Sequence, residues 1–313
     1  MEPISSVNTS VARSVRLQAD PRAIARQLAD AHHAIVSCER CPRLRAYCGR
    51  IAVEKKRAYR EDTYWGRPVP GFGDPAARLL LLGLAPAAHG ANRTGRVFTG
   101  DGTGGSGDFL MAALHRTGFS NLATSTRPDD GLRLTDAYIA AAVRCAPPDN
   151  KPLPEEITRC LDHLEAEVHA LQNVQVVVAL GKIAFDAWLQ LLNRYAGSAS
   201  AAARLQRNPA HDGGICGAGA AGGSVQRRRT RLDPRRPQFG HGVVVKFDQR
   251  PTAHYRLPTT DYRPPTLIGC YHPSRQNTNT GRLTLRMMVD VFRTARKLLG
   301  RHRSEGRDSH RRN

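Results

Sequence analysis

The chain has 313 residues, of which 40% are hydrophobic and 24% charged, and its formal net charge is +20. This length is enough to bury a large core, in one large domain or in two smaller ones. The sequence contains no apolar run of about 18 residues, which argues against a membrane-spanning helix, and no secretory signal opens it. We therefore expect a cytoplasmic protein whose seven cysteines stay reduced.

The positive charge favours a polyanionic partner, with nucleic acid as the first candidate. The alternative is a solvated basic surface whose charge lies largely in loose segments. Residues 198–238 are rich in Gly and Ala and then in Arg, which predicts a flexible insertion, and residues 301–313 form a basic tail. Residues 1–20 resemble a flexible leader, so we expect the folded domain to span residues 21–300.

Helical and strand patterns alternate along this domain. In chain order, they predict a helix at 21–37, a strand at 78–85, a helix at 107–118, a strand at 137–145, a helix at 154–172, a strand at 174–181, a helix at 182–197, a strand at 266–272 and a helix at 282–300. The strands are apolar throughout, as in parallel sheets buried on both faces. The fold class expected is therefore α/β, with three α/β/α layers around a central, mostly parallel four-stranded sheet.

Four cysteines are spaced as ligands: Cys38, Cys41, Cys145 and Cys160. The first two form a C-x₂-C turn, and two distant thiolates can complete a tetrahedral set. Zinc and a 4Fe–4S cluster both accept four thiolates, so the spacing leaves both open. Cys48 competes for one ligand position. Cys270 fits a buried thiol better than a ligand, and Cys216 fits an incidental thiol in the insertion.

Four ordered segments carry a resemblance to a known family: CERCPRL (38–44), GLAPAAHGANRTGRVFTGD (83–101), RCAPPDNKPLPEE (144–156) and CYHPSRQNTNTGRLT (270–284). Together they resemble the iron–sulfur uracil-DNA glycosylases, and among them the type 5, or B-type, group. The resemblance extends from Ala34 to Leu299 outside the insertion. It implies the α/β/α fold of that superfamily, a 4Fe–4S cluster on the four spaced cysteines, and hydrolytic removal of uracil from DNA at the start of base excision repair.

Two departures from the better-known uracil glycosylases fit the type 5 pattern. The first predicted strand is followed by GLAPAA, with no carboxylate or amide to position water, and the second ends in AAAVRC, without an asparagine to read uracil. The type 5 pattern implies a wider range of substrates, including other deaminated bases. It also requires the polar chemistry to come from other residues.

An enzyme of this kind must extrude the base from the DNA stack. Glycines let the 83–101 loop approach a flipped nucleotide, with backbone amides near Leu84, Ala85 and Ala88 available to the base. Phe98 is expected to stack on the base, and a core phenylalanine is the alternative. His89 and Asn92 are candidates for the pocket lining. Arg275 is a candidate for a phosphate contact or for a wedge in the DNA, a role that Gln276 shares.

Cleavage of an N-glycosidic bond places positive charge on the sugar and negative charge on the departing base. We expect Asp101 to face the sugar, where it orients water or stabilises the cation; a turn aspartate is the alternative. His272 is expected to donate a hydrogen bond to the base oxygen, although a lone histidine is more often structural. Asn150 is expected to position water or the base, with a turn residue as the alternative.

The sequence thus predicts a monofunctional glycosylase that acts as a monomer on double-stranded and also single-stranded DNA, within the bacterial nucleoid. Two alternatives remain open. One is a protein of the same fold that binds damaged DNA without releasing a base. The other is a nucleic-acid-binding module stapled by zinc, with no catalysis at all.

Overall fold

A computed structural model describes residues 20–205, 237–247 and 264–308 of the chain. Most of the predicted insertion, including Cys216, lies outside these described residues. So do the leader up to residue 19 and the last five residues of the predicted tail.

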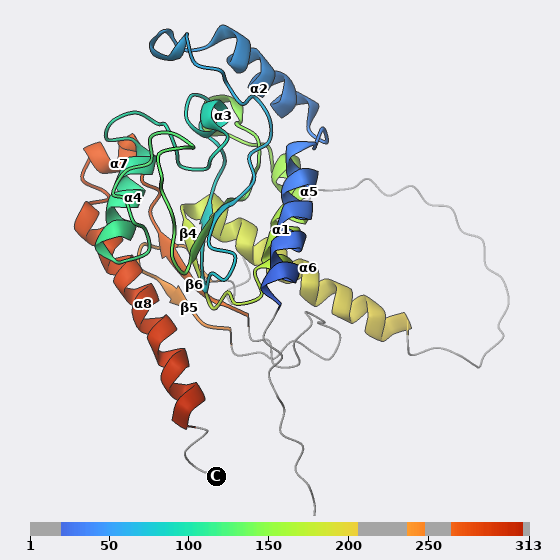
Figure 1. Cartoon of the computed structure of the whole chain (residues 1–313). Coiled ribbons are helices and arrows are strands. Elements are labelled where there is room, and N and C mark those ends of the chain that lie inside the picture. The colour runs from blue at the N-terminus through green and yellow to red at the C-terminus, as the bar shows by residue number, and fades with distance from the viewer. Residues whose placement is uncertain (1–19, 206–236, 248–263, 309–313) are drawn as a thin grey trace, which may run out of the picture.

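One sheet forms the centre of the described part (Figure 1). Its four long strands are β2 (Leu79–Gly83), β3 (Ala137–Ala141), β4 (Val176–Leu180) and β6 (Thr266–Cys270), which pair in parallel in the order β3-β2-β4-β6. The four predicted strands are confirmed. Two-residue strands, β1 (Phe72–Gly73) and β5 (Val244–Val245), add antiparallel edges next to β3 and β6, so the sheet is mixed and six-stranded.

Eight α-helices surround the sheet in the described residues: α1 (Pro21–Val36), α2 (Pro42–Glu54), α3 (Ala91–Thr94), α4 (Ser106–Arg116), α5 (Pro154–Ala170), α6 (Lys182–Leu205), α7 (Arg275–Asn279) and α8 (Leu285–Asp308). Short 3₁₀ turns, η1 (Arg57–Tyr59) and η2 (Pro148–Asn150), lie between them. Helices α4 and α8 cover one face of the sheet, and α1, α5 and α6 cover the other, as Figure 1 shows. The predicted three-layer α/β/α architecture is confirmed.

Helix α6 continues beyond Gly197, where the sequence predicted its end. The residues that follow, SASAAARL, are rich in alanine, the strongest helix former, and this preference outweighs the cost of about 1 kcal/mol for one glycine inside a helix. The helix therefore enters the segment that was predicted to be a flexible insertion. Helix α8 likewise runs into the predicted basic tail.

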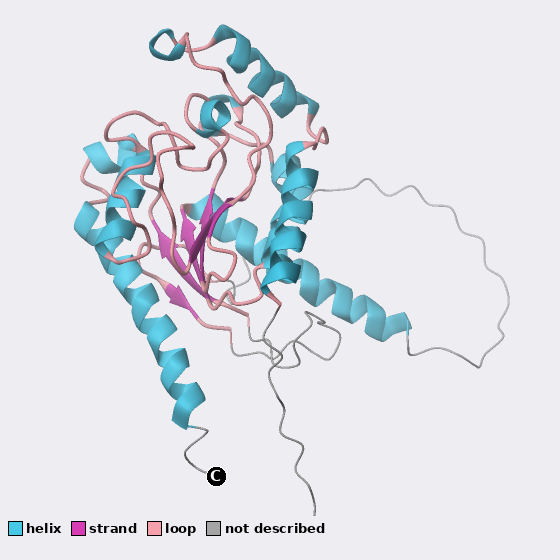
Figure 2. Ribbon diagram, viewed as in Figure 1, coloured by secondary structure: helices cyan, strands magenta, loops and turns pink. Residues whose placement is uncertain are grey.

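The strands point toward the end of the molecule that carries α2, α3 and α7 (Figures 1 and 2). Parallel sheets bind ligands at the carboxyl ends of their strands, so this end is the expected location of a site. The segments after β2, β3 and β6 contain nearly all of the candidate residues. In the described part of the chain, no helix combines the length and apolar content needed to cross a membrane.

Candidate active site and cysteine cluster

Phe98 adopts a backbone conformation that bulky residues avoid. Its φ is +51°, in the left-handed region, where a non-glycine residue stores about 1–3 kcal/mol of strain. The ring lies against β2, because a β-carbon on Gly83 would stand 2.8 Å from its Cε2 atom. Gly83 thus provides room for the ring. Strain of this kind at the end of a buried strand is typical of functional sites.

Asp101 ends the same loop, and its side chain is only partly exposed. Its Oδ2 accepts a hydrogen bond of 3.3 Å from the backbone N–H of Gly107, at the start of α4. Burial raises the pKa of the carboxyl group, and the neighbouring Asp108 adds to the rise. The hydrogen bond from Gly107, together with Arg275 and Arg93, opposes that rise. The carboxylate is therefore destabilised by its surroundings and kept close to arginine side chains.

His272 follows β6 directly and is also partly buried. Its ring centroid lies 5.9 Å from that of Phe98, with an angle of 32° between the planes. The backbone carbonyl of His272 accepts a hydrogen bond of 2.8 Å from Nδ2 of Asn277, which fixes the turn into α7. Burial lowers the pKa of the imidazole to about 4. His272 is therefore neutral at pH 7, with one N–H to donate and one nitrogen to accept.

Two contacts join the loop after β2 to the turn after β6. One is the ring contact of Phe98 with His272. The other is a long hydrogen bond of 3.4 Å from Nη2 of Arg275 to the backbone carbonyl of Asp101. These four predicted residues thus belong to one site at the carboxyl edge of the sheet. The loop that carries the Asp101 carboxyl group and the turn that carries the neutral His272 imidazole are thus connected, and groups of these two types can take part in acid–base or electrostatic catalysis.

The predicted residues of the loop after β2 differ in burial: Leu84, Ala85 and Ala88 are partly exposed, and Asn92 is buried. Leu84 and Ala88 are half-buried along the loop, and the carbonyl of Leu84 pairs with the N–H of Val143 at 2.9 Å. Ala85 packs against the cysteines. Asn92 is fully buried, and its Nδ2 donates to the carbonyls of Cys48 and Ala88 at 3.4 Å each. This position differs from the predicted lining role, since the Asn92 side chain anchors the loop to α2.

His89 and Asn150 have contrasting environments. Nδ1 of His89 lies 3.1 Å from the Tyr64 hydroxyl, and burial is the main cause that lowers the pKa of this imidazole. Asn150 is exposed at the end of η2, where it and Asp149 both have left-handed backbones, with φ of +57° and +54°. Among the described residues, no hydrogen bond of the Asn150 side chain links it to Asp101 or His272. This geometry agrees with the turn residue that the sequence offered as the alternative for Asn150, since Asp and Asn adopt the left-handed conformation more readily than other non-glycine residues.

Arg93 connects the pocket loop to the segment around η1. Its guanidinium group donates to Asp62 at 2.5 Å, to the carbonyl of Gly100 at 2.7 Å and to that of His89 at 3.0 Å. It also stacks over the ring of Tyr59, 3.9 Å from the centroid. Sequence reasoning missed this connection. The run RAYRED at 57–62, basic and aromatic, was the available signal.

The predicted ligand cysteines come from four separate places. Cys38 follows α1, Cys41 caps α2, Cys145 follows β3, and Cys160 lies in α5. Cys41, Cys145 and Cys160 belong to one buried cluster, and Cys38 interacts electrostatically with Cys41 and Cys160. The described residues contain no group of three or more His, Cys, Asp or Glu side chains arranged around a single metal ion.

Cys48 lies in the same buried cluster as Cys41, Cys145 and Cys160. It is fully buried, and its Sγ donates to the carbonyl of Ala146 at 3.6 Å. Its side chain is also hydrogen-bonded to that of Cys145. Cys270 is buried within β6 among apolar residues, which agrees with its predicted role as a buried thiol.

Each cysteine of the set has its own arginine, in the pairs Cys38–Arg40, Cys41–Arg159, Cys145–Arg45 and Cys160–Arg144. In addition, the backbone N–H of Arg144 donates to Sγ of Cys160 at 3.3 Å. Burial raises the pKa of the Cys41 and Cys160 thiols, and the neighbouring positive side chains and the N–H donor oppose that rise, since they stabilise thiolates. The surroundings therefore suit an anionic group bound through four sulfur atoms.

A buried network of charged and polar side chains begins at Arg144, next to Cys160. Arg144 is 1% exposed and Glu167 is fully buried, and their Nη2 and Oε2 atoms are 2.6 Å apart. Oε1 of Glu167 accepts hydrogen bonds from the N–H of Gly71 at 2.7 Å and from the Tyr138 hydroxyl at 3.2 Å. That hydroxyl lies 2.7 Å from Nε2 of His32 on α1. Nε and Nη1 of Arg144 have no partner among the described residues.

Comparison of the sequence with known proteins assigns the chain to a family. The sequence model described as "Uracil DNA glycosylase superfamily" matches residues 70–296, more than half of the chain. The chain belongs to the uracil-DNA glycosylase superfamily. The fold described above is accordingly the fold of that superfamily, with its candidate residues at the carboxyl edge of the sheet.

Relatives narrow the assignment within the superfamily. A type-5 uracil-DNA glycosylase of Thermus thermophilus is 44% identical over 85% of this chain and 95% of its own length. One of Mycobacterium tuberculosis is 43% identical over 86% of this chain and 81% of its own. A type-4 uracil-DNA glycosylase of Pyrobaculum aerophilum is 29% identical over 53% of this chain. The chain is therefore a member of the type-5 family.

Proposed function

We propose that this superfamily member hydrolyses the N-glycosidic bond of deoxyuridine in DNA and so starts base excision repair. One observation carries the proposal: the loop that holds Asp101, a carboxyl group with a raised pKa, is joined to the turn that holds His272, a neutral imidazole with a lowered pKa, by the Phe98–His272 ring contact and by the bond from Arg275 to the Asp101 carbonyl. Both shifts arise mainly from burial, which disfavours the charged form of each group, and titratable groups perturbed in this way cluster at functional sites. Binding of damaged DNA without base release would not require them.

The base has to leave the DNA stack before the bond can be reached. The ring of Phe98 provides a stacking surface for the extruded base, and its strained backbone fixes that surface in advance. Stacking of this kind contributes about 1–3 kcal/mol and accepts any base. Backbone groups of Leu84, Ala85 and Ala88 supply the polar contacts, while His89 borders the loop. This arrangement favours uracil and, beyond it, other deaminated or damaged bases.

Asp101 and His272 then each stabilise one of the two charges that develop as the N-glycosidic bond breaks. As the bond breaks, the sugar becomes cationic, and the Asp101 carboxylate stabilises it or orients the attacking water. The base departs as an anion, and the neutral His272 donates its N–H to the base oxygen. A donor preset at a developing anion contributes about 10²–10³ in rate. Asn150 joins them only if binding of DNA brings the η2 turn inward, and Arg275 contacts the DNA from the other side.

We assign a 4Fe–4S cluster to Cys38, Cys41, Cys145 and Cys160. The set of four sulfurs, the arginine beside each one and the N–H bond to Cys160 fit an anionic cluster. When bound, the cluster supplies a rigid covalent connection between the α1–α2 segment and the sheet. Hydrolysis of an N-glycosidic bond transfers no electron, so the residues described above carry the reaction.

The proposal also covers the form of DNA that is bound, the oligomeric state and the location in the cell. The positive charge favours double-stranded DNA, and single-stranded DNA can enter the same pocket because no contact proposed here needs the opposite strand. We place the protein with the nucleoid, as a monomer whose catalytic domain spans residues 21–300. The segments at 198–238 and 301–313 add nonspecific attraction to DNA.

A base-release assay tests the function. Wild-type protein is incubated in excess with duplexes that contain uracil, hypoxanthine or xanthine, and abasic sites are counted after alkaline cleavage. We expect release from the uracil duplex, and a rate about 10²–10⁴-fold lower for Asp101→Asn. Asp290→Asn is the matched control, since Asp290 is an exposed carboxylate on α8 that pairs with Arg293 at 2.9 Å. Absence of release by the wild-type protein, with DNA binding intact, would favour the non-catalytic alternative.

A further inference from the structure

The segment around η1 has a surplus of positive charge that its own acids do not neutralise. Each acid in it already pairs with an arginine: Glu54 with Arg50 at 3.2 Å, Glu61 with Arg60 at 3.0 Å and Asp62 with Arg93 at 2.5 Å. Lys55, Lys56 and Arg57 remain; Lys55 donates to a backbone carbonyl, and Lys56 and Arg57 are both exposed. Within the described residues, Arg57 has no ion-pair partner and Lys56 only faces the ring of Tyr59, at 5.8 Å.

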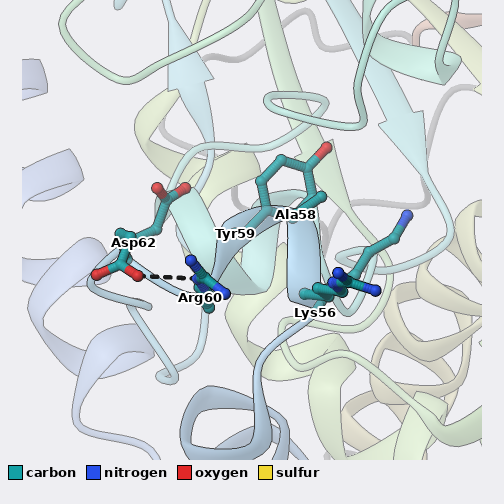
Figure 3. A pocket seen from close by; sticks show the side chains of 7 residues that line it. Lys56, Ala58, Tyr59, Arg60 and Asp62 are labelled. Atoms are coloured by element: carbon teal, nitrogen blue, oxygen red, sulfur yellow. Dashed lines mark hydrogen bonds and ion pairs between the residues drawn. The ribbon is translucent and has the colours of Figure 1, made fainter.

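This segment is held in place rather than left to move freely. Nζ of Lys55 donates to the carbonyl of Arg60 at 3.1 Å, which closes the turn. The N–H of Lys56 donates to the hydroxyl of Tyr64 at 3.3 Å. Together with the contacts of Arg93, these bonds fix the concave side of the segment, a hollow of about 630 Å³ lined by residues 56–62 (Figure 3). A preset surface loses less entropy when it binds a ligand.

The hollow opens beside the candidate active site. Tyr59 projects away from the turn in Figure 3. A β-carbon on Gly102 would lie 3.3 Å from the Tyr59 hydroxyl and 3.7 Å from Nη2 of Arg275. Gly102 directly follows Asp101, so the hydroxyl of Tyr59 and the guanidinium group of Arg275 both lie close to the end of the loop that carries Asp101. Two unpaired cations and a hydroxyl donor at that position match the chemistry of a phosphodiester.

We propose that Lys56, Arg57 and Tyr59 form a phosphate-binding site that holds the DNA backbone next to the extruded nucleotide. This inference rests on the proposed function. The two cations attract the backbone by releasing counterions, and the Tyr59 hydroxyl donates to one phosphate oxygen. Arg93 couples the site to the pocket, because it bonds to the η1 segment on one side and to the pocket loop on the other.

The test compares two double variants that remove the same charge. Lys56→Ala/Arg57→Ala changes the proposed site, while Arg26→Ala/Arg133→Ala removes two other exposed arginines, one on α1 and one before β3. The probe is a duplex with one tetrahydrofuran abasic-site analogue. Its affinity is measured by fluorescence anisotropy from about 50 to 200 mM salt, and thermal unfolding checks that all variants are folded.

We expect the slope of log affinity against log salt to fall by about 1.8 for the first variant, about 0.9 for each lost phosphate contact, and to stay at the wild-type value for the second. Tyr59→Phe should bind about 5-fold more weakly, as for loss of one hydrogen bond. Equal slopes for the two double variants would overturn the inference, and wild-type affinity of Tyr59→Phe would remove Tyr59 from the site. Uracil release by the wild-type protein is measured in parallel, so that failure of the proposed function is recognised separately.

Discussion

The carboxyl group of Asp101 lies directly against the α-carbon of Gly90, so that a methyl group on that carbon would overlap its Oδ1 atom. Gly90 caps α3, on the same loop. The loop is thus shaped around the carboxylate, and the residue at position 90 controls where that carboxylate points.

We therefore predict that Gly90→Ala lowers the rate of uracil release by at least about tenfold, because the Asp101 side chain has to rotate away from the new methyl group. The loss should appear in the single-turnover rate. Gly49→Ala is the control: a β-carbon there meets nothing within 4 Å, and alanine stabilises a helix by about 0.5–1 kcal/mol relative to glycine. A Gly90→Ala protein with the wild-type rate would contradict the role given to Asp101.

The pH dependence of the reaction should identify Asp101 as the group that titrates on the acid side. Because burial raises the pKa of Asp101, its carboxylate is lost at a higher pH than for an exposed aspartate, and the rate falls with it. His272, with its pKa lowered to about 4, stays neutral over that range. In Asp101→Asn, the slow residual rate should stay flat until the pH approaches 4. Single-turnover rates from pH 4 to 8 are the measurement.

Stability should respond to the same two groups with opposite signs. A raised carboxyl pKa means that protonation of Asp101 favours the folded state as the pH falls. A lowered imidazole pKa means that His272 removes stability as the pH falls from about 6.5, where it is protonated in the unfolded chain, toward 4. Loss of activity through Asp101 is therefore distinguishable from unfolding. A thermal melt at each pH of the rate profile provides this control.

The cysteines provide a prediction that separates the cluster ligands from their neighbours. Cys160→Ala should abolish the visible absorption and the iron content of the purified protein, because Cys160 interacts with the other three cysteines of the set. Cys48→Ala should keep both, since Cys48 is not one of the four proposed ligands and its Sγ already donates to the carbonyl of Ala146. Cys270→Ala is a control for removing a buried thiol. Iron loss in Cys48→Ala but not in Cys160→Ala would reverse the ligand assignment.

The buried pair of Arg144 and Glu167 should dominate stability among the ion pairs described here. Glu167→Ala leaves the Arg144 charge buried and unpaired, and we expect a loss of about 3–5 kcal/mol in the free energy of unfolding. Glu54→Ala, which breaks an exposed pair with Arg50, should change it by less than about 0.5 kcal/mol. Chemical denaturation of both variants measures the difference. Comparable losses would mean that the network contributes little.

The sequence predicted the fold well because the decisive patterns are local. Each of the four parallel strands is an apolar run, and α5 begins with Pro154 and two acids in its first turn. Helix α2 was missed for two reasons. Few of its residues are apolar at helical spacing, and Cys41 at its N-cap is not one of the usual capping residues. The edge strands β1 and β5 were missed because two residues carry no periodicity.

The candidate site was predictable only where a motif marked it. Asp101, Phe98 and His272 lie in recognisable segments, and their contacts agree with a shared site. The linking roles of Arg93 and Arg144 were not predictable, since their partners come from distant parts of the chain. The left-handed backbone of Phe98 was not predictable either, because no residue pattern in the sequence indicates it. These features depend on three-dimensional proximity, which a linear pattern does not encode.

Helices α6 and α8 both lead away from the end of the molecule where α3 and α7 lie (Figure 1). We therefore expect changes in chain length directly after either helix to leave the end of the molecule with Asp101 and His272 unchanged. The same geometry suits attachment chemistry: a linker fixed after α8 would anchor the molecule to a glass surface with its reactive end free to scan stretched DNA.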